Sequence, residues 1–216
     1  MRGRQAVEAI RAYPVGYLPI GCLERHGDHL PMGLDVIKAH GICCIAAQAI
    51  GGVVFPPHYY SGIHGFTSQE LEKYTGEWGN VYTDTSAKAH LVDVLRQLAI
   101  LGIKALVLYS GHYPQQQVDM ILEIAGEFEQ SGIRVIPFWE MEIMGGDHAG
   151  ISETSFMLYL NRELADMTAI GEANYADHGW TAEIAPELAS AAKGENDVET
   201  VVVHLRGKIE RALARG

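Results

Sequence analysis

The chain has 216 residues, a formal net charge of −11 at pH 7, and 48% hydrophobic and 20% charged residues. This length and composition suit a globular protein with a buried core, and we expect a single domain over residues 1–216. The acidic balance argues against nucleic acid as a partner, because there is no surplus of Lys and Arg to neutralise phosphates. No apolar run reaches about 18 residues, which argues against a membrane-spanning helix.

The cysteines are Cys22, Cys43 and Cys44, and none of them belongs to a C-x-x-C motif. An odd number of cysteines without such a motif favours reduced thiols, and we therefore expect a cytoplasmic protein. The first residues carry early arginines but no long apolar stretch after them, so we expect no signal peptide.

Strand and helix patterns alternate along the chain. Short apolar segments predict strands over residues 15–21, 53–55, 104–109 and 133–138. Amphipathic or apolar segments with helix-ending signals predict helices over residues 4–13, 36–50, 85–101, 114–130, 151–165 and 197–214. Residues 58–81 predict a long irregular loop, and residues 167–195 show no clear pattern. Strands that alternate with helices predict an α/β fold with a mostly parallel sheet.

Polar clusters follow each expected strand. They are Glu-Arg-His-Gly-Asp-His at 24–29, the stretch 58–64, Ser-Gly-His at 110–112, and the stretch 139–153. Ligands of open α/β sheets bind beyond the carboxyl ends of the strands. We therefore expect these clusters to meet in one site.

The clusters contain five candidate metal ligands, which are Glu24, His26, Asp35, His112 and Glu153. Glu24 and His26 are two residues apart, so both side chains point the same way if the chain stays extended. Nitrogen and oxygen donors without a thiolate suit Zn²⁺, Mn²⁺ or Fe²⁺. A shared Asp could bridge two such ions.

Each candidate also has a structural explanation. Asp35 suits the N-cap of the helix that follows it. Glu153 suits the first turn of a helix, where an acid interacts favourably with the helix dipole. Glu24 could pair with Arg25 or Lys38 on the surface. A set of five such residues at strand ends is harder to explain this way than any one of them.

His148 follows Asp147 where the chain enters an expected helix. Its ordinary pKa lies near neutrality, so His148 is a candidate general acid or base, with a structural role as the alternative. The long loop offers four candidates for substrate contacts, for which an ordinary exposed-loop role fits equally well. They are Tyr59, Tyr60, His64 and Trp78.

Three segments, residues 18–35, 110–112 and 147–155, resemble the motifs of the creatininase (creatinine amidohydrolase) family. The order and spacing are similar from about residue 15 to residue 165. The resemblance implies a three-layer α/β/α fold and two divalent ions, Zn or Mn with Fe as a further option. It also implies hydrolysis of a small-molecule amide through a metal-bridging hydroxide, and a homo-oligomer, often a hexamer.

The resemblance also implies roles for individual residues. The metal ligands of the family fall on Glu24, His26, Asp35, His112 and Glu153. Asp35 takes the bridging position, and His148 falls on the histidine that works beside the metals.

Two positions depart from the family pattern. Ser110 stands where family members usually carry Asn, and Pro114 stands where creatininases carry a metal-ligating Glu. Because Pro114 has no ligating side chain, the motif argues against creatinine itself as the substrate. We therefore expect an amidohydrolase acting on a small cyclic amide or a formamide. The alternatives are a deformylase or peptide-trimming enzyme of the same family, and a metal-binding homologue without catalysis.

Overall fold

The computed structural model describes residues 1–170 and 185–214. Within these residues, four strands form one sheet in the order β2-β1-β3-β4. Their bounds are β1 Val15–Ile20, β2 Val53–Val54, β3 Ala105–Ser110 and β4 Arg134–Phe138. Every neighbouring pair is parallel, as the alternation of strands and helices predicts.

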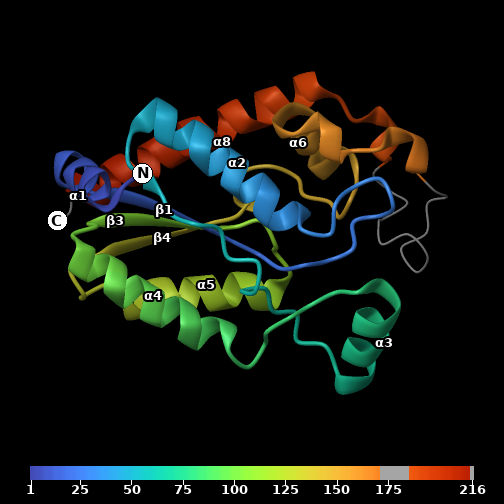
Figure 1. Ribbon diagram of the computed structural model, residues 1–216, viewed down its shortest axis with the longest axis horizontal. Coiled ribbons are helices and arrows are strands. Elements are labelled where there is room, and N and C mark those ends of the chain that lie inside the picture. The colour runs from blue at the N-terminus through green and yellow to red at the C-terminus, as the bar shows by residue number, and fades with distance from the viewer. Residues whose placement is uncertain (171–184, 215–216) are drawn as a thin grey trace.

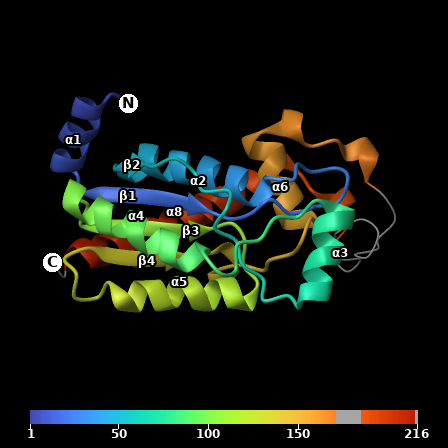
Figure 2. The same ribbon diagram turned by 60° about the horizontal axis from the view of Figure 1, so that its bottom comes forward.

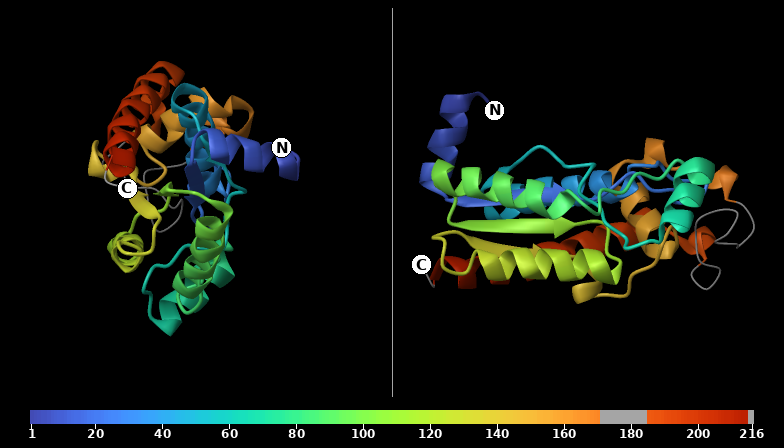
Figure 3. Two further views of the ribbon diagram at one scale, coloured as in Figure 1. Left: turned by 90° about the vertical axis from the view of Figure 1, so that its left-hand side faces the viewer. Right: turned by 90° about the horizontal axis from the view of Figure 1, so that it is seen from below.

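Helices cover both faces of the sheet (Figures 1 and 3). One layer contains α4 (Ala87–Leu101) and α5 (Gln115–Glu127), and the other contains α2 (Leu34–Ile50), α6 (Ile151–Leu160) and α8 (Ala191–Ala214). The helix α1 (Gly3–Ala12) lies at one end of the molecule (Figure 2). The expected three-layer α/β/α architecture is therefore confirmed.

The two central strands are buried along their whole length, which explains their continuous apolar sequences. Leu18 and Leu106 pack with the layer of α4 and α5, whereas Tyr17 and Val107 pack with the layer of α2 and α8. This alternation places one hydrophobic core on each side of the sheet.

One helix lies where we expected a loop. Residues Ser68–Trp78 form α3, so the prediction of an irregular segment over residues 58–81 is wrong for these residues. Thr67 starts the helix with a capping box, in which its hydroxyl accepts from Glu70 N at 3.3 Å and the Glu70 carboxylate accepts from Thr67 N at 2.9 Å. Figures 1 and 2 show α3 away from the layers that cover the sheet.

Two other helix boundaries differ from expectation. The helix α6 ends at Leu160, earlier than predicted, and α8 begins at Ala191 rather than at residue 197. A Cβ atom on Gly194 would collide with the backbone oxygen of Ser155, so this glycine allows the early part of α8 to pack tightly on α6.

Short 3₁₀ helices connect the main elements, and they are η1 Glu140–Glu142, η2 Arg162–Leu164, η3 Met167–Ala169 and η4 Pro186–Leu188. Part of the segment without a clear sequence pattern, residues 171–184, lies outside the described residues. Among the helices of the described residues, none combines the length and the apolar character needed to span a bilayer.

Candidate metal centre

The site forms where β1 and β3 end at the same level. Ile20 pairs with Ser110 in the sheet, so the chain leaves both strands side by side. Two glycines follow these strands, and both make room for α2. A Cβ atom on Gly21 would lie 2.8 Å from Cβ of Asp35, and one on Gly111 would collide with the Asp35 backbone oxygen. The two glycines thus let Asp35 reach the strand ends.

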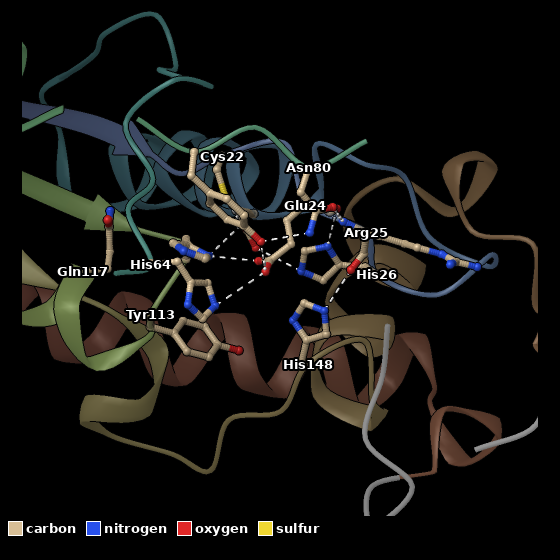
Figure 4. A network of polar contacts seen from close by, with 12 residues as sticks. Cys22, Glu24, Arg25, His26, His64, Asn80, Tyr113, Gln117 and His148 are labelled. Carbon is tan, nitrogen blue, oxygen red and sulfur yellow. Dashed lines mark hydrogen bonds and ion pairs between the residues drawn. The ribbon is translucent and has the colours of Figure 1, made fainter. Parts of the chain in front are cut away.

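All five predicted ligands converge at this point, and each of them is at most 4% exposed. Asp35 lies at the centre, with Oδ1 3.2 Å from Nε2 of His26 and Oδ2 3.4 Å from Nδ1 of His112. Nδ1 of His112 is also 3.0 Å from Oε2 of Glu24. Nε2 of His26 is 3.5 Å from Oε2 of Glu153. Figure 4 shows part of this cluster.

Backbone carbonyl groups hold the other nitrogen of both imidazoles. Nδ1 of His26 is 2.8 Å from the oxygen of Glu24, and Nε2 of His112 is 3.1 Å from the oxygen of Ile63. A carbonyl oxygen only accepts, so each of these ring nitrogens must carry a proton. In the neutral ring, the second nitrogen then presents a lone pair to the carboxylates. Such an arrangement is typical of metal-binding histidines. The lone pair of the ring nitrogen repels the carboxylate oxygens, and a cation between them removes this repulsion.

The electrostatics of the cluster agree with this interpretation. Burial alone would lower the pKa of His26, but Glu153 and Asp35 raise it to about 9. Burial raises the pKa of Glu24, yet His112 and His148 lower it to about 2. The buried carboxylates therefore stabilise positive charge next to the imidazoles, and divalent ions would supply that charge.

The donors of the described residues form three sets, and the atoms within each set lie within 4.8 Å of one another. Two sets share Asp35: one consists of Cys22, Glu24, Asp35 and His112, and the other of His26, Asp35 and Glu153. The third set consists of Glu24, His26 and His148. A carboxylate that belongs to the first two sets can bridge two ions through its two oxygens. The residues present therefore fit a binuclear centre.

Cys22 is a side chain at the cluster that the sequence analysis did not predict. Its buried thiol donates to Oδ2 of Asp35 at 3.4 Å. The signal was present in the spacing, because Cys22, Glu24 and His26 follow one another at intervals of two residues.

Lys38 is a second missed residue. Its side chain is fully buried on α2, with Nζ 2.8 Å from Oε1 of Glu153 and 3.2 Å from Oε1 of Glu140. Burial would lower the pKa of Lys38, but Glu140 and Glu153 raise it above its ordinary value, so the ammonium group stays charged. The alternative in which Glu24 pairs with Arg25 or Lys38 on the surface is therefore wrong.

The helix start at α6 fixes the other oxygen of Glu153. Asp147 accepts hydrogen bonds from the backbone nitrogens of Gly150, Ser152 and Glu153, which caps the helix. Ala149 has a φ of 53° and donates from its nitrogen to Oε2 of Glu153 at 2.7 Å. Glu153 thus occupies the first turn of α6, as its structural explanation predicts, and also faces the cluster.

The structural explanation of Asp35 is different. Gly33 takes the N-cap position of α2, and Asp35 lies in the first turn of that helix. An N-cap role for Asp35 is therefore wrong, and its carboxylate remains directed at the two histidines.

His148, a member of the third donor set, lines a small cavity of about 240 Å³. Its ring centroid is 4.3 Å from that of His26, and its Nε2 lies 2.8 Å from the backbone oxygen of Arg25. The cavity is also lined by His64, Tyr113 and Pro114. Tyr113 places its hydroxyl 3.1 Å from Oε1 of Glu153.

The structure separates the four candidates for substrate contacts. His64 lines the cavity, with Nε2 4.0 Å from Oε1 of Glu24. Tyr59 and Tyr60 line a different cavity, and Trp78 lies under the guanidinium group of Arg25, 5.8 Å from the ring centre. The structure thus does not place Tyr59, Tyr60 and Trp78 on the cavity beside the cluster, because the chain after β2 and the helix α3 direct them elsewhere.

Tyr82 contacts the cluster in their place. Its hydroxyl donates to Oε1 of Glu24 at 2.8 Å and accepts from the Asn80 amide at 2.9 Å.

Ser110, the residue that replaces Asn, contributes to the turn before His112. Its hydroxyl donates to the His112 carbonyl and accepts from Gln117 Nε2 at 3.0 Å. Sequence patterns gave no signal for these supporting contacts, because they depend on the course of the loops.

Comparison with known proteins supports the fold and identifies the family. The family model for creatininase, described as creatinine amidohydrolase, matches residues 1–209. A creatinine amidohydrolase of Pseudomonas putida is 30% identical, with the match covering 71% of this chain and 66% of that enzyme. The match thus spans just under two thirds of the relative's own length.

Solved structures show the same likeness. A crystal structure of creatinine amidohydrolase has a TM-score of 0.76 at 27% identity, covering 98% of this chain and 95% of the other. A manganese form of creatininase has a TM-score of 0.73 at 25% identity, covering 98% and 96%. A Zn-Zn form of a creatininase mutant has a TM-score of 0.76 at 25% identity, covering 98% and 95%. The chain therefore belongs to the creatininase family.

Proposed function

We propose that this chain is a metal-dependent amidohydrolase that cleaves the C–N bond of a small cyclic amide or a formamide. The observation that carries this proposal is the position of Asp35, whose two oxygens face two separate donor sets. Relatives of known structure include Zn-Zn and manganese forms. We therefore propose two divalent ions, Zn²⁺ or Mn²⁺ with Fe²⁺ as the alternative, as the cofactors.

Each predicted ligand has a place in this proposal. Glu24 and His112 would hold one ion, His26 and Glu153 would hold the other, and Asp35 would be shared by both. The chemistry that such a pair of ions supplies is the activation of water near neutral pH and the polarisation of a carbonyl oxygen. The protein contributes a buried, preorganised set of donors in which backbone carbonyls orient both imidazoles.

His148 is proposed as the group that delivers a proton to the leaving nitrogen. The contact between Nε2 and the Arg25 carbonyl fixes the orientation of the ring, as a group that transfers a proton requires. The ring lines the cavity beside His26, so a substrate bound at the ions would lie within its reach. Tyr113 and His64 shape the same cavity.

The size of the cavity and the residue at position 114 bear on the substrate. A space of about 240 Å³ suits a small molecule. Pro114 lines this space, where it offers an apolar surface and no ligand. These features support a small amide other than creatinine, with a deformylase or peptide-trimming activity as the alternative.

A substrate panel with a matched variant tests the proposal. The metal-loaded protein is assayed with creatinine, other cyclic amides, formamides and short peptides, alongside His148→Ala. We expect turnover of a cyclic amide or formamide, its loss in His148→Ala, and unchanged metal content in that variant. Turnover of peptides alone would support the alternative, and wild-type rates in His148→Ala would contradict the role of His148.

A homo-oligomer and a cytoplasmic location stay predictions.

A further inference from the structure

The thiol of Cys22 lies among three of the proposed metal ligands. The residue lies two positions after the end of β1, is fully buried, and shares a donor set with Glu24, Asp35 and His112. Figure 4 shows Cys22 close to Glu24, with the sulfur drawn in yellow. The other donor set that includes Asp35, with His26 and Glu153, contains only nitrogen and oxygen.

The position of the sulfur suits a ligand of the ion that Asp35 would hold. With metal–sulfur bonds of about 2.3 Å and metal–nitrogen or metal–oxygen bonds of about 2.0–2.1 Å, neighbouring ligand atoms lie roughly 3.3–3.6 Å apart. The Cys22 sulfur is 3.4 Å from Oδ2 of Asp35, and Nδ1 of His112 is 3.4 Å from the same oxygen. The distance of 3.0 Å between Nδ1 of His112 and Oε2 of Glu24 is shorter than this range. The sulfur and the imidazole therefore both lie at ligand-to-ligand distance from Asp35.

A purely structural role explains less of this arrangement. Cys43 shows what such a role looks like, since it is buried in the hydrophobic core between α2 and the sheet. Cys22 instead faces two carboxylates and an imidazole, an environment that repels a thiolate unless a cation lies between them.

We propose that Cys22 is a thiolate ligand of the ion held by Glu24, Asp35 and His112, and that it makes this site selective for Zn²⁺ over Mn²⁺. The inference rests on the metal centre of the proposed function. When the ion binds, the sulfur–hydrogen bond breaks, a metal–sulfur bond forms, and the proton passes to solvent without any redox change. Sulfur favours Zn²⁺, whereas the set of His26, Asp35 and Glu153 is the harder site and accepts Mn²⁺.

Cobalt spectroscopy tests the sulfur bond directly. The protein is stripped with a chelator and titrated with Co²⁺, while the absorption spectrum and the number of bound ions are recorded. We expect a thiolate-to-cobalt charge-transfer band in the near ultraviolet for the wild type. The band should be absent from Cys22→Ser and present in Cys44→Ser, a control on α2 whose sulfur lies near His40. In competition experiments, Cys22→Ser should lose at least about tenfold in Zn²⁺ affinity, while Mn²⁺ binding changes little.

The outcomes separate this inference from the proposed function. Two bound Co²⁺ ions without the band in the wild type would overturn the thiolate ligand and leave the metal centre intact. An absence of bound metal would overturn both. Should Cys22→Ser fail to fold, X-ray absorption of the wild-type zinc protein decides. A zinc–sulfur distance of about 2.3 Å, with one sulfur atom per two zinc ions, would support Cys22 as a ligand. A zinc spectrum without a sulfur scatterer would reject it.

Discussion

The ammonium group of Lys38 lies 2.8 Å from Oε1 of Glu153, and neither side chain is more than 3% exposed. The same ammonium group contacts Glu140, which also accepts from the hydroxyl of Tyr109 at 3.0 Å. A buried lysine is stable only when it is paired. This ion-pair network lies directly behind a proposed metal ligand, and it holds one oxygen of Glu153 while the other faces His26.

Lys38→Met should destabilise the metal-free protein by about 3–5 kcal/mol, because two buried carboxylates lose their cation. Excess Zn²⁺ should restore part of this loss, since the ion supplies positive charge at Glu153. Urea unfolding with and without metal measures both effects. The double variant Lys38→Met/Glu140→Gln is the control and should be more stable than Lys38→Met. A single variant as stable as the wild type would show that the network contributes little.

Gly111→Ala should damage the metal centre from outside the ligand set. Its Cβ atom would collide with the Asp35 backbone, so α2 must shift, at a cost of roughly 1–3 kcal/mol, and the Asp35 carboxylate must move with it. We expect weaker binding of both ions in calorimetric titration. Gly126→Ala is the matched control, because nothing lies within 4 Å of its added Cβ atom. Normal metal binding in Gly111→Ala would contradict the tight approach of α2 to the strand ends.

Ala149 adopts a left-handed conformation, with a φ of 53°, immediately before the N-cap of α6. Glycine adopts this conformation without steric cost, so Ala149→Gly should raise the free energy of unfolding by up to about 1 kcal/mol. Ala149→Val should lower it and weaken metal binding, because the Ala149 nitrogen orients Glu153. Thermal unfolding measures the stability of the two variants and the wild type. We expect Ala149→Gly to be the most stable and Ala149→Val the least stable, and the reverse order would contradict a strained conformation at Ala149.

Thr67→Ala should destabilise α3 alone. Loss of the capping hydroxyl costs about 1 kcal/mol, and α3 contributes no proposed ligand. Amide hydrogen exchange should therefore rise within residues 68–78, while metal content stays at the wild-type value. A loss of metal from this variant would mean that α3 supports the site in a way that the contacts do not indicate.

The architecture and the convergence of the five proposed ligands could be predicted because local patterns determine them. The strands β1 and β3 are buried on both faces and therefore read as continuous apolar runs. Parallel strands bring their carboxyl ends together, which is why residues as distant as Glu24 and His112 could be expected in one site. The capping box that starts α3 was visible in the sequence too, as Thr67 followed by Glu70, but the surrounding glycines and aromatic residues favoured a loop.

Other features depend on tertiary structure that no local pattern specifies. Lys38 looks like a surface residue, because lysine is rarely buried without a partner, and the positions of Glu140 and Glu153 explain its burial. Tyr59 and Trp78 lie close in sequence to His64, but the course of the chain sends their side chains to other cavities. Cys22 carried a usable signal in its spacing from Glu24, which the expectation of a site without sulfur overlooked.

The central claim is that Asp35 bridges two metal ions. Metal content per chain, measured by plasma mass spectrometry on protein purified without a metal-affinity tag, tests it most directly when the wild type is compared with Asp35→Ala. We predict close to two transition-metal ions per chain in the wild type and close to none in the variant, with both proteins folded by circular dichroism. A wild type that takes up no Zn²⁺ or Mn²⁺, or an Asp35→Ala variant that retains two ions, would contradict the bridging carboxylate.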